Sequence, residues 1–136
     1  IIGGATFVGL AKLLKNRKTV LYQTAPIFRE NVINYKMSKQ KDSLDNIYKS
    51  ILDSDLLIID DLGTESLNSM KLSELFTILN TRILNLNHKP TKTIISTNLN
   101  INDIFNNYEE RIGSRIAGYY DIYCFFGDDL RFKRGI

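Results

Sequence analysis

The sequence predicts an α/β domain with a parallel, doubly wound sheet, and three observations support this fold class. The run Leu56–Ile59 is continuously apolar, which suits a strand that is buried on both faces of a parallel sheet. Predicted strands and helices alternate along the chain, as they do where helices connect parallel strands. The length of 136 residues suits one domain, which buries roughly two thirds of its unfolded surface.

In the first half of the chain, a strand ending near Ile2 leads through a glycine turn into a helix with an apolar stripe. Pro26 can begin a later helix, because its missing N–H is not needed at the first helical position. The predicted elements after the turn are the helix Thr6–Leu14, the strand Lys18–Thr24, the helix Pro26–Tyr35, the polar loop Lys36–Ser43 and the helix Leu44–Leu52.

In the second half, the longest predicted helix is amphipathic and ends before Pro90. An apolar run near the end of the chain predicts a last strand, in which Cys124 is expected as a small core residue. The predicted elements of this half are the helix Leu67–Leu86, the strand Thr91–Thr97, a short helical or irregular piece at Ile101–Tyr108, the helix Glu109–Tyr119, the strand Asp121–Phe126 and a basic tail.

Composition excludes several classes of protein. One cysteine and one histidine can form neither an intrachain disulfide nor a Cys/His zinc cluster. The net charge of +3 permits a nucleic-acid partner without requiring one. The sequence has no apolar run long enough to cross a membrane and no signal peptide, so we expect a cytoplasmic protein without a membrane partner. The chain also starts without methionine, and we therefore expect an excised domain of a longer protein.

Two acids, Asp60 and Asp61, follow the central apolar strand directly. Open α/β sheets bind ligands in the crevice outside the carboxyl ends of their strands, which is where these acids are expected. In P-loop NTPases an acid at this place holds Mg²⁺, and an acid beside it can orient the attacking water. A buried strand that ends in a solvated turn explains this motif equally well on its own.

The turn Gly3-Gly4-Ala5-Thr6 stands between the first predicted strand and helix, as a phosphate-binding loop does. The full pattern G-x-x-x-x-G-K-[ST] is absent. The turn is either a relic of G-K-T without its lysine, or the end of a loop from which residues are missing in this chain. A glycine turn before a helix is also common where no phosphate binds.

Three further polar signals follow later strands and helices. Asn98 ends the strand after the acidic one, where an amide can bind a water or a γ-phosphate or can simply begin a turn. Arg111 and Arg115 are four residues apart and share one helix face, which is either solvent-exposed structure or a cation for a γ-phosphate. Arg131 follows the last predicted strand and is either a site residue or an ordinary charge of the tail.

The ordered set LLIIDDLGTE, IISTNL, YEERIGSRI and GDDLR, which spans about Thr6–Arg131, resembles the ATPase domain of bacterial replicative helicase loaders of the DnaC/DnaI type, which are AAA+ proteins. Transposition helper ATPases of the IstB type share most of this set. The resemblance implies a P-loop NTPase core with a five-stranded parallel sheet of order 5-1-4-3-2, helices on both faces and no helical lid. Its strands would end near Ile2, Gln23, Asp60, Thr97 and Phe126.

The resemblance also implies a role for each matching residue. Asp60 would be the Walker B acid on Mg²⁺, and Asp61 the second acid, which polarises water. The other implied residues are Asn98 as sensor 1, Arg115 as an arginine finger offered to a neighbouring subunit's ATP, Arg131 as a sensor 2 arginine, and Gly3, Gly4 and Thr6 in the phosphate-binding loop. No lysine precedes Thr6, and this departure puts nucleotide binding and hydrolysis in question.

The function that the resemblance implies is ATP-dependent loading of the replicative DNA helicase, with ATP and Mg²⁺ as cofactors and head-to-tail self-association. Loaders of this type grip the helicase with a separate amino-terminal domain that has no counterpart here, so residues 1–136 would be the motor domain alone. Single-stranded DNA would contact Lys36, Lys39 and Lys41, with Tyr35 available for stacking, although a solvated loop explains these residues equally well. The alternatives are an IstB-like transposition helper and a degenerate, non-hydrolysing AAA+ interaction module.

Overall fold

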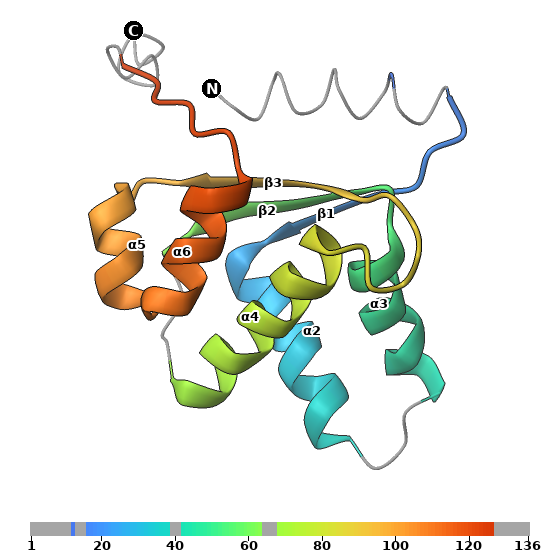
Figure 1. Cartoon of the computed structure of the whole chain (residues 1–136). Helices are drawn as coiled ribbons and strands as arrows, with labels where there is room; N and C mark the ends of the chain where they lie inside the picture. The colour runs from blue at the N-terminus through green and yellow to red at the C-terminus, as the bar shows by residue number, and fades with distance from the viewer. Residues whose placement is uncertain (1–11, 13–15, 39–41, 64–67, 127–136) are drawn as a thin grey trace, which may run out of the picture.

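The structure is a computed structural model, and it describes Lys12 and residues 16–38, 42–63 and 68–126 (Figure 1). The described strands and helices alternate, as the sequence predicts. In chain order they are β1 (Val20–Thr24), α2 (Ala25–Met37), α3 (Asp42–Asp53), β2 (Leu56–Leu62), α4 (Ser69–Ile83), β3 (Lys92–Thr97), α5 (Ile101–Asn107) and α6 (Glu110–Tyr119).

The sheet is parallel, and β2 lies between β1 and β3. In the register of the sheet, Ile58 of β2 is opposite Tyr22 of β1 on one side and Ile94 of β3 on the other. The predicted position of the acidic strand, between the strands ending near Gln23 and Thr97, is therefore confirmed. The five-stranded order is not confirmed, because the described sheet has three strands, the strand expected near Ile2 lies outside the described residues and residues 121–126 form no strand.

The described helices pack on one face of the sheet (Figure 1). The helix expected at Thr6–Leu14, which would cover the other face, lies outside the described residues except for Lys12. Along β2, Leu57 and Ile59 belong to the core on the helical face, whereas Leu56 and Ile58 are 6% and 2% exposed on the opposite face. The prediction of a strand buried on both faces is thus confirmed.

The core joins the sheet to α2, α3, α4, α5 and α6. Its fully buried side chains are Ile51, Leu57, Ile59, Ile78, Leu79, Tyr108 and Ile112. The helices have local start signals: the Asn68 side chain accepts a hydrogen bond from Lys71 N at 2.9 Å, and Asn100 with Asp103 forms a capping box. No helix in the described ranges is long and apolar enough to span a membrane.

Two predictions about the last apolar run are wrong. Residues 121–126 form no strand, and Ile122, Tyr123 and Phe126 are 55%, 76% and 95% exposed. Cys124, which we expected in the core, is exposed as well. A strand forms only where another strand offers its backbone groups, and no described strand lies beside this run. Apolar composition indicated the propensity for a strand but not the presence of a partner.

An unpredicted buried arginine ties α4 to the amino-terminal side of the sheet. Arg82 is 2% exposed and donates hydrogen bonds to the carbonyl oxygens of Ile51 at 2.8 Å, Leu52 at 3.0 Å and Lys92 at 2.7 Å. Its Nε also donates to Thr93 Oγ1 at 2.9 Å. Burial lowers the pKa of Arg82 to about 10, so the guanidinium stays charged at neutral pH. Backbone carbonyls, rather than a carboxylate, satisfy this buried cation.

Candidate functional site

Asp60 lies at the carboxyl end of β2, on the sheet face opposite the described helices. Its position follows from strand alternation: Leu57 and Ile59 enter the helical core, so Ile58 and Asp60 point to the other face. Its carboxylate accepts a hydrogen bond from a hydroxyl group on each of the two neighbouring strands. Tyr22 Oη of β1 donates to Oδ2 at 2.5 Å, and Ser96 Oγ of β3 donates to Oδ1.

These hydrogen bonds stabilise the ionised form of Asp60. The Ser96 hydroxyl and then the Tyr22 hydroxyl lower the pKa of Asp60, while its partial burial acts in the opposite direction. The same contact raises the pKa of Tyr22, because the phenol donates its proton to the carboxylate. At neutral pH the site therefore holds a fixed carboxylate and a neutral tyrosine.

A β-bulge at Asp60-Asp61 sets the direction of the second acid. The register of β2 with β3 shifts between Ile59 and Leu62, so two residues of β2 face one residue of β3. Asp61 has a φ of 57°, a left-handed conformation that aspartate tolerates better than most residues. Its backbone N–H donates to Ser96 Oγ at 3.0 Å. Ser96 thus contacts both acids, and the Asp61 side chain is exposed.

Asn98 follows the end of β3 and is exposed. Leu62 is paired with Thr97, and Thr97 Oγ1 donates to Leu62 O at 2.6 Å, so Asn98 emerges at the same edge of the sheet as the two acids. Glycine is required at position 63, where the chain after β2 passes close to Leu99. The φ of Gly63 is 109°, and a Cβ there would lie 2.8 Å from Leu99 Cδ1. The structure thus gathers Asp60, Asp61 and Asn98 at the carboxyl end of the sheet, as predicted.

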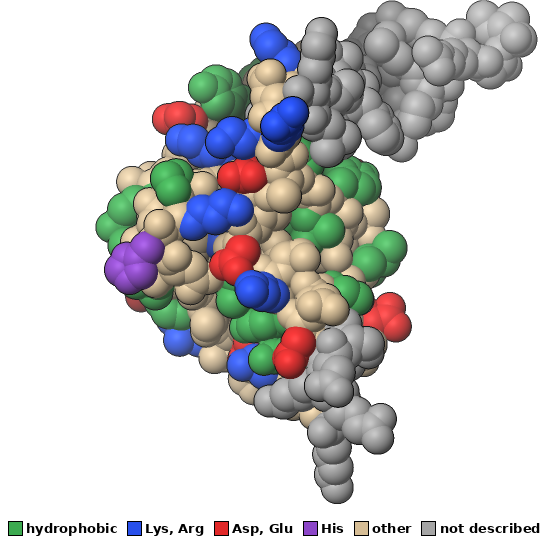
Figure 2. Space-filling model, turned by 90° about the vertical axis from the view of Figure 1, so that its right-hand side faces the viewer, with side chains coloured by type: hydrophobic (Ala, Val, Ile, Leu, Met, Phe, Trp, Pro, Cys, Tyr) green, Lys and Arg blue, Asp and Glu red, His purple; other side chains and the backbone are tan. Residues whose placement is uncertain are grey.

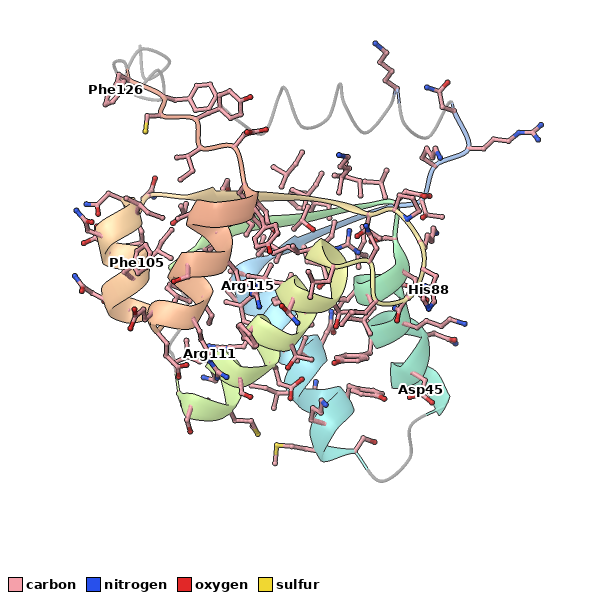
Figure 3. The ribbon with its side chains drawn as sticks, in the orientation of Figure 1. Asp45, His88, Phe105, Arg111, Arg115 and Phe126 are labelled. Atoms are coloured by element: carbon pink, nitrogen blue, oxygen red, sulfur yellow. The ribbon has the colours of Figure 1, made fainter. Side chains whose placement is uncertain are left out.

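Arg111 and Arg115 project from α6 toward α4, where both guanidinium groups lie over the ring of Phe76 (Figure 3). The distances from the guanidinium carbon to the ring centre are 4.7 Å for Arg111 and 5.9 Å for Arg115. Arg111 also pairs with Glu109 at 2.8 Å, rather than with Glu110. Within the described ranges Arg115 makes no ion pair.

Lys36 and Tyr35 contact other helices of the same chain. Lys36 Nζ lies 3.4 Å from Glu74 Oε2 and 5.6 Å from the ring centre of Tyr48. Tyr35 stacks on Tyr48 with ring centres 4.1 Å apart. Lys36 and Tyr35, which were expected at the DNA contact, therefore join α2 to α3 or α4 in this structure. The remaining candidates, Lys39, Lys41, Gly3, Gly4, Thr6 and Arg131, lie outside the described residues.

The two acids fit Mg²⁺ by the chemistry of their donors. Mg²⁺ commonly takes one or two carboxylates and completes its octahedron with water and phosphate oxygens. Each oxygen of Asp60 accepts one hydroxyl hydrogen bond and so keeps a further lone pair. The described part of the chain contains no group of three or more His, Cys, Asp or Glu that could hold a metal ion. With one or two carboxylates as its ligands, the site suits a Mg²⁺ ion that is shared with a phosphate ligand.

Sequence reasoning missed Tyr22, Ser96 and Phe76. A strand pattern indicates that Tyr22 and Ser96 alternate with core residues, but it does not indicate which residue of β2 each of them will face. The cross-strand register carries that information, and it depends on the whole sheet. Phe76 lies within the amphipathic helix predicted at Leu67–Leu86, and nothing local in the sequence distinguishes an apolar residue of this helix that meets two arginines.

Comparison with known proteins gives a fold match. No protein-family model matches the chain, and no curated protein matches it in sequence. Among solved structures, a DNA replication initiation factor matches 90% of this chain with a TM-score of 0.68 and 24% identity. The DnaC helicase loader matches 87% with a TM-score of 0.67 and 19% identity. A replication initiator DnaA bound to AMPPCP and single-stranded DNA matches 90% with a TM-score of 0.64 and 23% identity.

The chain spans 36% of the initiation factor, 70% of the DnaC loader and 36% of DnaA. At these identities the matches show the fold, which is an α/β fold with the parallel sheet of these replication proteins. The α/β class and the parallel sheet agree with what the alternation of strands and helices in the sequence predicts.

Proposed function

We propose that the chain is an AAA+ motor domain that binds ATP and Mg²⁺ and loads the replicative DNA helicase in the cytoplasm. The observation that carries this proposal is the arrangement at the end of β2. There Asp60 is held ionised by hydroxyls from both neighbouring strands, Asp61 is turned outward by a bulge, and Asn98 emerges beside them. A fold match to the DnaC helicase loader supports the choice of a replication motor over other P-loop proteins.

In this proposal Asp60 is the Mg²⁺ ligand, Asp61 polarises the attacking water, and Asn98 contacts that water or the γ-phosphate. Gly3, Gly4 and Thr6 cradle the phosphates, and Arg131 contributes a further cation. When bound, Mg²⁺ neutralises charge on the phosphate oxygens. The match to DnaA bound to AMPPCP, an analogue of ATP, supports nucleotide as the ligand class.

Arg115 is the proposed finger that reaches the ATP of the next subunit in a head-to-tail assembly. Its guanidinium contacts the rings of Phe76 at 5.9 Å and Tyr119 at 5.7 Å. Aromatic rings orient a guanidinium without neutralising it, so the charge stays available to a phosphate. Single-stranded DNA is the proposed nucleic-acid partner, with Lys36, Lys39 and Lys41 as the candidate phosphate contacts.

The direct test compares nucleotide binding and hydrolysis in the wild type and in Asp60→Ala, with Asp45→Ala as the matched control. Asp45 is an exposed carboxylate on α3, which lies away from the carboxyl ends of the strands (Figure 3). We expect Asp60→Ala to abolish Mg²⁺-dependent hydrolysis and Asp45→Ala to retain it. Equal Mg²⁺-dependent ATP hydrolysis by all three proteins would contradict the proposed function.

The absent lysine before Thr6 supports a second candidate, a non-hydrolysing AAA+ interaction module. This candidate predicts binding to a partner protein without turnover of ATP. A third candidate is an IstB-like transposition helper, which would prefer duplex over single-stranded DNA. Measuring ATP turnover together with affinity for single-stranded and duplex DNA separates the three.

A further inference from the structure

We propose that Tyr22 is a positioning residue for the Mg²⁺ site, whose hydroxyl fixes the carboxylate of Asp60 in the direction that receives the cation. This inference rests on the proposed function, because it concerns the same site. It adds a residue of β1 that the sequence motifs do not include.

The sheet register places Tyr22 where only a long side chain can reach Asp60. Thr24 of β1 is directly opposite Asp60, and Tyr22, two residues earlier on the same face, is opposite Ile58. Diagonal neighbours across a sheet lie within reach of aromatic side chains. The phenol spans this diagonal, and its Oη lies 2.5 Å from Asp60 Oδ2.

Hydrogen bonds from two hydroxyl groups, one to each carboxylate oxygen, define the orientation of the Asp60 carboxylate. Ser96 holds Oδ1 from β3, while Tyr22 holds Oδ2 from β1. With Ser96 alone, the carboxylate can still turn about its bond to Cβ. Partners of this kind, which contact a metal ligand rather than the metal, typically change metal affinity by about tenfold to a hundredfold when they are removed.

Of the two hydroxyl groups, that of Tyr22 can be removed with less disturbance to the rest of the site. Ser96 is buried and also accepts the backbone N–H of Asp61, so replacing it would disturb the bulge as well. Tyr22 is 41% exposed, and Tyr22→Phe removes the hydroxyl while it retains the ring. Tyr123→Phe makes the same chemical change at a tyrosine that is 76% exposed in residues 121–126, and it serves as the matched control.

The test measures AMPPCP binding by calorimetry in the full chain, over a series of Mg²⁺ concentrations and in EDTA. We expect Tyr22→Phe to raise, by about tenfold or more, the Mg²⁺ concentration at which the increase in AMPPCP affinity is half-maximal. Its nucleotide affinity in EDTA should equal that of the wild type, because the hydroxyl acts through Asp60 alone. Tyr123→Phe should match the wild type under both conditions.

The outcomes separate the inference from the function on which it rests. If the wild type binds AMPPCP with a Mg²⁺ dependence that Tyr22→Phe leaves unchanged, the role of Tyr22 is overturned and the proposed function stands. If Tyr22→Phe weakens binding equally with Mg²⁺ and in EDTA, its role is structural and the inference also fails. If the wild type binds no AMPPCP at any Mg²⁺ concentration, the proposed function fails and the inference fails with it.

Discussion

Asp60 shows how the chemistry of the site depends on residues from three strands. Its carboxylate accepts hydroxyl hydrogen bonds from Ser96 and Tyr22, and these lower its pKa. A carboxylate that is stabilised in the folded state contributes stability wherever it is ionised. The contribution is complete above its unfolded pKa, about 3.9, and is lost as the pH falls through the lower folded value.

The first residue-scale prediction therefore concerns Asp60→Asn and acid. Near neutral pH the wild type should be more stable than Asp60→Asn, because the amide accepts weaker hydrogen bonds than the charged carboxylate. The difference in the free energy of unfolding should shrink as the pH falls below about 4, where the unfolded carboxyl becomes protonated. Urea denaturation at a series of pH values measures it. A difference that stays constant across that range would mean that Asp60 is not held ionised by its partners.

Among the helices, α6 carries two glycines, Gly113 and Gly118, whose surroundings differ. Gly113 is buried against α5, and a Cβ added there would lie 2.7 Å from Cγ of Phe105 (Figure 3). Gly118 is exposed, and an added Cβ would meet no atom within 4 Å. The close packing of α5 on α6, which places Arg111 and Arg115 beside α4, thus depends on a glycine at only one of the two positions.

We predict opposite effects of the same substitution at these glycines. Gly118→Ala should stabilise the protein by about 0.4–1 kcal/mol, because alanine restricts the unfolded chain and favours helix. Gly113→Ala should destabilise it by about 1–3 kcal/mol, since the ring of Phe105 must move. Chemical denaturation of both variants checks the pair. A stabilising Gly113→Ala would show that α5 and α6 are less tightly packed than this structure has them.

The elements also show which features the sequence could predict. The helices α2, α3 and α4, the three described strands and their parallel order were predictable, because periodicity, Pro26 and the strand–helix alternation are local signals. The positions of Asp60, Asp61 and Asn98 at the carboxyl ends of strands were predictable, since each follows an apolar run. The last strand was not, because its formation depends on a partner strand that residues 121–126 cannot specify. Tyr22 and Ser96 were missed because register is a property of the assembled sheet.

At the scale of the whole molecule, one face of the described surface carries charges of both signs. On the side that carries the histidine, His88, basic and acidic side chains are interspersed (Figure 2), and Lys89 lies 3.7 Å from Asp55. Mixed charge of this kind gives little net attraction for a nucleic-acid backbone. The proposed phosphate contacts for single-stranded DNA stay Lys36, Lys39 and Lys41.

The proposed function requires subunits to assemble, because Arg115 of one subunit acts at the ATP of its neighbour. A finger offered in trans stabilises charge that develops in the transition state, and in well-studied NTPases it is worth about a thousandfold or more in rate. It adds little to nucleotide affinity in an isolated subunit, where no neighbour is present. Arg115→Ala should therefore retain ATP binding and lose the hydrolysis that depends on assembly.

The most direct test mixes Arg115→Ala with Asp60→Ala and measures ATP hydrolysis. Each variant alone should be inactive, because one lacks the finger and the other lacks the Mg²⁺ ligand. In the mixture, some interfaces pair the intact phosphate site of Arg115→Ala with the intact finger of Asp60→Ala, so we predict that hydrolysis returns in part. If both variants fold and associate but the mixture stays inactive, the account of a motor completed by its neighbour is contradicted.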